Sequence, residues 1–231
     1  MKMIALLRRD FSLFFSKQNL LFLLPLICLA CLGIFDLLPS LSGTETFATM
    51  MGIRTQNLRN PLLFSSYFIL WGYYIWFCLA WFHYDYKYSP EFMLKRISFP
   101  TLLKSKLLSI GILTFCSQII LNLLIGVIFG LQNIEITFLD LLYWNILVFV
   151  IRYTMQMFFL LMFSLFHHYG YLFIILFLLL PVLRIVDIDV MGWIYEISYG
   201  WLVWLILGIF MTLGLYFYCK THSSKLLERR D

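Results

Sequence analysis

Charged residues are scarce in this chain of 231 residues. They make up 13% of it, whereas 62% of the residues are hydrophobic and 19% are aromatic. A water-soluble domain carries about 25% charged residues and about 45 to 50% apolar ones. So few charges cannot cover a water-facing surface, and the long apolar runs leave no room for a separate soluble domain. The composition therefore predicts an integral membrane protein.

The sequence also lacks the patterns of common catalytic and metal sites. It has no Gly-x-x-x-x-Gly-Lys-Ser/Thr phosphate loop. Its histidines lie at the predicted ends of spans, whereas a rhomboid-like serine site needs a histidine well inside the membrane. Its cysteines lie at irregular spacing inside apolar runs, which favours small core residues over disulfides or a metal cluster. We therefore predict no enzyme, no bound metal and no cofactor in this chain. The residues concerned are His83, His167, His168 and His222, and Cys28, Cys31, Cys78, Cys116 and Cys219.

Six apolar runs are long enough to be read as membrane-spanning helices, which need about 20 mostly apolar residues each. The first starts too late and is too long for a cleaved leader, so we expect it to remain as a span. We predict an all-α polytopic protein with one transmembrane domain over 1–231, made of an interfacial helix (1–19), six spans within 20–219 and a tail (220–231). The predicted spans are 20–38, 62–83, 105–130, 139–166, 170–186 and 199–219.

The basic residues are concentrated on one side of this predicted arrangement. An even number of spans places both termini on the same side, and thirteen of the seventeen Lys and Arg residues fall there. The positive-inside rule makes that side cytoplasmic, in a multi-pass protein of the cell membrane. Anionic membrane lipid accounts for the net charge of +5, so no nucleic-acid partner is expected. The thirteen are Lys2, Arg8, Arg9, Lys17, Lys87, Lys95, Arg96, Lys104, Lys106, Lys220, Lys225, Arg229 and Arg230.

The N-terminal segment has the periodicity of an amphipathic helix. Five apolar residues recur at helical spacing, and Lys2, Arg9 and Lys17 face the other way. We expect this helix to lie in the cytoplasmic membrane interface. The alternative is a frayed charged tail before the first span. The apolar residues are Ile4, Leu7, Phe11, Phe14 and Phe15.

The loop between the second and third predicted spans contains a short helix of its own. Ser89 is a good N-cap, Pro90 suits the first helical position, and Glu91 lies where the helix dipole favours an anion. Pro100 prevents this helix from continuing into the third span. We predict a helix over 90–97 that lies along the membrane surface.

The surface of the 90–97 helix is more apolar than a solvated loop requires. It therefore offers a docking surface for a cytoplasmic partner, and the alternative is a helix that rests on lipid headgroups. Its central residues are Glu91, Phe92, Met93, Leu94, Lys95 and Arg96.

Polar residues occur at membrane depth in two spans. Arg152 lies near the middle of the fourth span, where an unpaired cation costs from about 3 to more than 10 kcal/mol. Asn145 and Gln156 share its helix face, and Gln118 and Asn122 on the third span have the spacing of a matching stripe. We expect these five residues to line a translocation path or a subunit seam. The alternative is a buried network that only locks two helices together.

Together these features resemble the membrane subunit of type-2 ABC exporters. The shared features are the amphipathic N-terminal helix, six spans, a long first external loop, and the acidic-start helix followed by Ser-Phe-Pro-Thr-Leu-Leu-Lys-Ser-Lys-Leu-Leu at 98–108. The resemblance implies that 90–97 is the coupling helix that docks on the ATPase. It also places the segment 181–199 where that family has a re-entrant pair of short helices, although this segment is shorter than in the larger relatives.

The resemblance implies an ATP-driven exporter permease for a hydrophobic or amphipathic substrate such as a peptide, a lipid-linked molecule or a drug. ATP and Mg²⁺ would then bind a separate ATPase subunit, and a second copy of this chain or a related permease would complete the transporter. The competing interpretation is a non-transporting membrane protein, an immunity or assembly factor that binds a partner in the bilayer.

Overall fold

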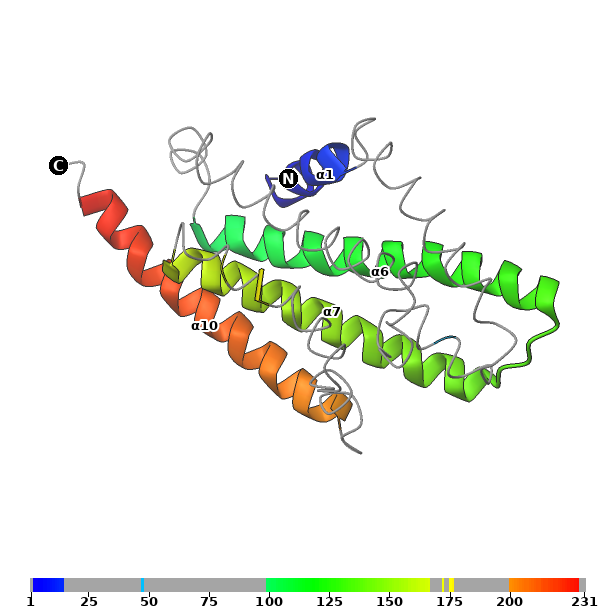
Figure 1. The fold of residues 1–231 in the computed structure, drawn as a ribbon. Coiled ribbons are helices and arrows are strands. Elements are labelled where there is room, and N and C mark those ends of the chain that lie inside the picture. The colour runs from blue at the N-terminus through cyan, green and yellow to red at the C-terminus, as the bar shows by residue number, and fades with distance from the viewer. Residues whose placement is uncertain are drawn as a thin grey trace.

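The computed structural model describes residues 2–14, 47, 99–166, 172, 175–176 and 200–228 (Figure 1). Four helices are defined over these residues: α1 (Lys2–Phe14), α6 (Phe99–Gln132), α7 (Phe138–Phe166) and α10 (Gly200–Glu228). The described part of the chain contains no strand, which confirms the all-α class for that part. The predicted spans 20–38 and 62–83, the helix 90–97 and the segment 181–199 lie outside the described residues, as does most of 170–186.

Two of these helices contain segments long and apolar enough to cross a membrane, Leu103–Leu131 and Phe138–Met162. They lie where spans were predicted at 105–130 and 139–166. The shorter apolar stretch Leu202–Tyr218 in α10 coincides with the prediction at 199–219. α6 has 34 residues and is therefore about 51 Å long, which exceeds the hydrocarbon thickness of about 30 Å. These features are those of a membrane protein.

α6 has a proline in its first turn. Its first residue is Phe99, which places Pro100 in the first helical turn. Proline is tolerated there because the backbone N–H groups of the first turn have no partner within the helix. Pro100 thus lies in the first turn of α6, and the predicted break between 90–97 and this helix lies outside the described residues.

α6 ends in a left-handed residue that reverses the chain. Asn133 has a φ of 51°, and the N–H of Ile134 donates to the carbonyl of Phe129 over 3.0 Å. This is the hydrogen bond of a Schellman motif, which usually comes with an apolar contact between the same two positions. Ile134 does pack against the cluster that contains Phe129. The turn is therefore closed by both a hydrogen bond and apolar packing.

α7 starts with a side-chain cap. The backbone N–H of Asp140 donates to Thr137 Oγ1 over 3.2 Å, and the Thr137 hydroxyl donates to Asp140 Oδ2 over 2.6 Å. A hydroxyl at this position satisfies an N–H that has no partner within the helix, and the carboxylate suits the positive end of the helix dipole. Five residues, 133–137, therefore connect α6 and α7 as an antiparallel pair.

The long helices pack side by side, with α10 against α7 and α1 across α6 (Figure 1). Thr154 of α7 contacts Gly208 of α10, and Leu161 contacts Gly214 further along, so α7 and α10 run parallel. Gly208 allows the closest approach, because a Cβ there would lie 2.7 Å from Thr154 Oγ1. The Thr154 hydroxyl also donates to the Trp204 carbonyl over 3.0 Å.

Two apolar clusters lie at opposite ends of this helix group. The cluster near the α6–α7 turn contains Phe47, Ile125, Ile128, Phe129 and Val148. The cluster at the other end contains Leu103, Ile110, Leu113, Met157, Leu160 and Leu215, with Phe11 of α1 packed against it. α1 and the C-terminal half of α10 therefore meet at the same end of α6.

The outward faces of the long helices remain apolar and exposed. Examples are Leu123, Val127, Leu131, Phe138, Leu139 and Phe210. An apolar surface of this extent requires a lipid or protein environment. It is consistent with helices that lie in a bilayer.

Candidate functional site

Three amides form the central contact between α6 and α7, which we call the amide cluster: Gln118, Asn122 and Asn145. Asn145 Oδ1 accepts hydrogen bonds from Gln118 Nε2 over 2.8 Å and from Asn122 Nδ2 over 2.6 Å. Gln118 Nε2 also donates to the Asn145 carbonyl over 2.7 Å. Gln118 and Asn122 meet Asn145 together because their spacing of four residues puts them on one helix face. The structure therefore brings the polar residues of α6 and α7 into contact, and their role in a translocation path or subunit seam stays a prediction.

The amide cluster leaves two acceptors unused. Gln118 Oε1 and Asn122 Oδ1 are buried and accept no hydrogen bond in the part of the chain that the structure describes. A buried polar atom without a partner costs about 1 to 3 kcal/mol. Their dipoles also place negative potential on the surrounding space.

A second polar contact joins the same two helices nearer the basic end. The Thr114 hydroxyl donates to Gln156 Oε1 over 3.0 Å, and both residues are buried. Gln156 was predicted as a site residue, whereas its partner Thr114 was not. Thr114 lies four residues before Gln118, just as Gln118 lies four residues before Asn122. The same spacing could have added Thr114 to the predicted stripe.

Arg152 lies on α7 between the amide cluster and Gln156. Its exposed fraction is 2%, so protein surrounds the residue. This agrees with the expectation that a cation at this depth does not face lipid. All five predicted stripe residues thus lie within or beside the α6–α7 contact.

A buried ionic cluster, which sequence reasoning missed, ties α1 to α6. Asp10 is fully buried, and Lys106 Nζ donates to its Oδ1 over 2.7 Å. Arg9 Nη2 donates to the same oxygen over 2.9 Å, and the Ser109 hydroxyl donates to Oδ2 over 3.1 Å. We call Arg9, Asp10, Lys106 and Ser109 the ionic anchor. A carboxylate is retained in a buried place when it is paired and hydrogen-bonded in this way.

The buried face of α1 is not the face that the sequence predicts, and it carries Asp10 of the ionic anchor. The helix itself is confirmed, but Leu6 and Asp10, four residues apart, are the buried residues, while Ile4 of the predicted apolar face is 70% exposed. Phe11 of that face does pack against the cluster of Leu103. The sequence does contain one sign of the ionic anchor. Asp10 is the only acidic residue before Asp36, and it lies in a basic segment.

The six predicted residues of the 90–97 helix lie outside the described residues. They are Glu91, Phe92, Met93, Leu94, Lys95 and Arg96. The described residue nearest to them in the sequence is Phe99, the first residue of α6.

No group of three or more His, Cys, Asp or Glu side chains that could hold a metal occurs among the described residues. Cys116 is a free thiol within α6. The chemistry of the described sites is therefore that of amides, hydroxyls and one ion-pair cluster.

Charge differs between the two ends of the helix group. Arg8, Arg9, Lys104 and Lys106 lie at the end where α1 packs on α6, and Lys220 follows the cluster of Leu215 in α10. Glu135 and Asp140 lie at the α6–α7 turn. We call these the basic end and the acidic end.

Searches for relatives gave no match: no protein-family model, no curated protein and no solved structure is similar to this chain at a significant level.

Proposed function

We propose that this chain is the permease subunit of an ATP-driven ABC exporter of type 2, with six spans and both termini in the cytoplasm. The cargo would be hydrophobic or amphipathic. A separate ATPase subunit would bind the 90–97 helix, and a second copy or a related permease would complete the transporter.

The ionic anchor is the observation that carries this proposal. Lys106 and Ser109 lie within the first eleven residues of α6, nine and twelve positions after the end of the 90–97 segment. If the ATPase pushed on that segment, the force would reach the start of α6 and, through Asp10, also α1. The proposal assigns α1 and α6 to one moving unit, which is the type of rigid-body motion by which packed helices transmit force.

The course of the helices supports the proposed topology. α7 and α10 run parallel, which requires an odd number of crossings between them if both span the membrane, and the predicted span 170–186 would supply one. α1 and the C-terminal half of α10 meet at the basic end. Concentration of Lys and Arg at that end is what the positive-inside rule expects of a cytoplasmic side.

Co-purification of the ATPase tests the proposal. Full-length chain carrying Glu91→Ala, Phe92→Ala and Leu94→Ala together should lose the ATPase in mild detergent. The matched control changes Leu226, Leu227 and Glu228 to Ala, which likewise removes one glutamate and two large apolar side chains, here from the proposed cytoplasmic tail, and should retain the ATPase. An ATPase that stays bound to the first variant contradicts the proposed docking site.

Arg152 separates a transport role from a structural one. We expect Arg152→Leu to abolish export while the chain stays in the membrane at its normal level, because the amide cluster and the Thr114–Gln156 contact still hold α6 and α7 together. Export from vesicles and the amount of chain in the membrane are measured side by side. Parallel loss of both would contradict a transport role for this residue.

The second candidate function is the non-transporting membrane factor. It is favoured by the burial of Gln118, Arg152 and Gln156 within a single chain, because a network that only locks two helices requires no route for cargo. Under this function the chain would co-purify with a membrane partner and no ATPase, and vesicles that contain it would show no ATP-dependent export.

A further inference from the structure

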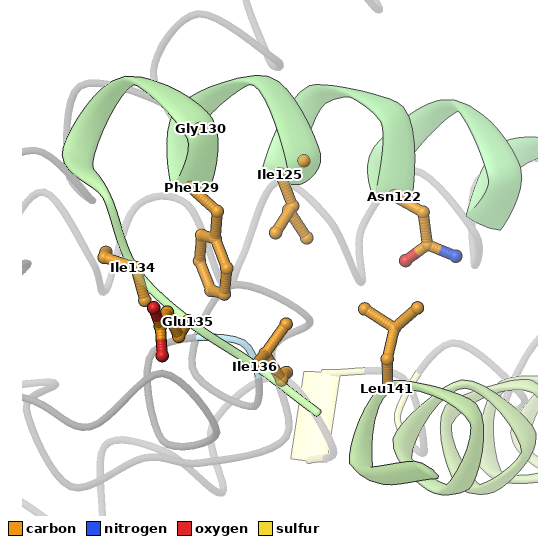
Figure 2. Close-up of a pocket in the computed structure, with 9 residues that line it drawn as sticks. Asn122, Ile125, Phe129, Gly130, Ile134, Glu135, Ile136 and Leu141 are labelled. Carbon is orange, nitrogen blue, oxygen red and sulfur yellow. The ribbon is translucent and has the colours of Figure 1, made fainter. Parts of the chain in front are cut away.

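A pocket opens at the acidic end, between the last turns of α6, the turn and the start of α7 (Figure 2). Its volume is about 510 Å³, within the range of about 300 to 1,000 Å³ that is usual for small-molecule sites. In Figure 2 the side chains of Ile125, Phe129, Ile136 and Leu141 converge on the space between α6 and α7. Most residues that line the pocket are apolar, and one of them, Phe129, is aromatic.

Gly126 and Gly130 keep this pocket open on the α6 side. Both line it, and a Cβ added at either residue would meet no other atom within 4 Å. These glycines are therefore not required for close packing of one helix on another inside this chain. Their effect is to leave space that a larger side chain would fill.

Among the described residues of α6, the turn and α7 around the pocket, the formal charges are negative. Glu135 lies at its mouth and is exposed, and Asp140 lies nearby in the first turn of α7. No Lys or Arg occurs in the sequence from 107 to 151. At the inner end, Asn122 lines the pocket, and the unpaired oxygens of Asn122 and Gln118 add their dipoles. The carbonyl groups at the C-terminus of α6 contribute the negative end of the helix dipole.

We propose that this pocket binds a hydrophobic organic cation. An apolar body would fill the space beside Ile125 and Ile136, and the positive charge would lie near Glu135 and the face of Phe129, where cation–π attraction adds to the charge pairing. The negative potential disfavours an anion of the same shape. The site is independent of the transport proposal, since it requires only α6, α7 and their connection. If the chain is an exporter, this class of compound is a candidate cargo.

Binding of tetraphenylphosphonium to the full-length chain in lipid nanodiscs tests the site, with empty nanodiscs as the baseline. Tetraphenylborate has the same shape and the opposite charge. We expect saturable binding of the cation, at least about tenfold tighter than that of the anion, which corresponds to about 1.4 kcal/mol. Because the assay contains no ATPase and no transport step, its result is independent of the proposed function.

Two substitutions localise the binding. Gly126→Leu fills the pocket and should weaken cation binding at least about tenfold. Val127→Phe adds the same number of carbon atoms at the next residue, which is exposed and does not line the pocket, and should leave binding unchanged. Glu135→Gln should weaken cation binding about threefold at low salt and less at high salt, because an exposed charge is screened.

Several results would overturn the proposal. These are no saturable binding of the cation above empty nanodiscs, unchanged binding by Gly126→Leu, or equal affinity for the anion. A change in the oligomeric mass of Gly126→Leu, with Val127→Phe unchanged, would instead make this face a contact between copies of the chain, and it too would contradict a ligand site.

Discussion

The basic end and the acidic end of the helix group are constructed differently. At the basic end, one fully buried carboxylate holds α1 on α6 through Lys106 and Ser109, and Arg9 of α1 pairs with the same carboxylate. At the acidic end, a five-residue turn closes α6 and α7 while a pocket of about 510 Å³ stays open beside it. The amide cluster lies between the two. The contrast indicates that one end is built to hold its elements together and the other leaves space for a further molecule.

Asp10→Asn should have the largest effect on stability, because it removes the carboxylate that pairs with the largely buried Lys106. Removal of one partner from a buried ion pair costs about 3 to 5 kcal/mol, so we expect a loss near 3 kcal/mol and release of α1 from α6. Thermal unfolding in detergent measures the first effect, and protease sensitivity of the N-terminal helix measures the second.

Arg8→Gln is the control for that experiment, since Arg8 is exposed next to the ionic anchor. It should change stability little. The double variant Asp10→Asn, Lys106→Gln should lose less than the sum of the two single variants. Equal losses for Arg8→Gln and Asp10→Asn would show that the anchor is not a stabilising contact.

Asn145→Leu should have the next largest effect, because it removes the side-chain acceptor shared by Gln118 and Asn122. Interhelical hydrogen bonds in membranes contribute about 0.6 kcal/mol on average, and buried donors left without a partner cost more. We therefore expect the free energy of unfolding to fall by about 2 kcal/mol. Ile146→Leu, at an exposed neighbouring residue, is the control. Replacement of all three amides by Leu should recover part of the loss, and no recovery would show that the amides do more than pair with one another.

Gly208→Ala should have the smallest of the three effects. The new Cβ would lie 2.7 Å from Thr154 Oγ1, so the hydroxyl must leave the Trp204 carbonyl. We expect the free energy of unfolding to fall by about 1 kcal/mol, which is at the low end of the cost of overpacking a helix contact. Gly214→Ala is the matched control on the same helix, because its Cβ would lie at an ordinary 3.5 Å from Leu161 Cδ2. A larger loss for Gly214→Ala would contradict the close crossing at Gly208.

The sequence was a good guide to features that repeat along one helix. Apolar runs predicted the positions of α6, α7 and α10, and the four-residue spacing of Gln118 and Asn122 predicted a stripe that matches Asn145. Pro100 lies in the first turn of α6. Each of these signals is local, because helix length, helix face and helix start depend on residues within a few turns.

The features that the sequence did not predict depend on contacts between distant residues. Asp10 and Lys106 are 96 positions apart, and nothing in either segment alone shows that they pair. Leu6 lies outside the predicted apolar face of α1, yet it is buried. The pocket depends on the Schellman turn at Asn133 and on the absence of side chains at Gly126 and Gly130, and only their placement together reveals the space.

Labelling of single cysteines from the two sides of the membrane tests the central claim most directly, in a chain whose native cysteines are replaced. If a motor binds at the basic end on the cytoplasmic side, Phe92→Cys and Ser223→Cys should react with an impermeant maleimide only in inside-out vesicles. Glu135→Cys should react only in right-side-out vesicles. Labelling of Phe92→Cys from the same side as Glu135→Cys would contradict the proposed permease.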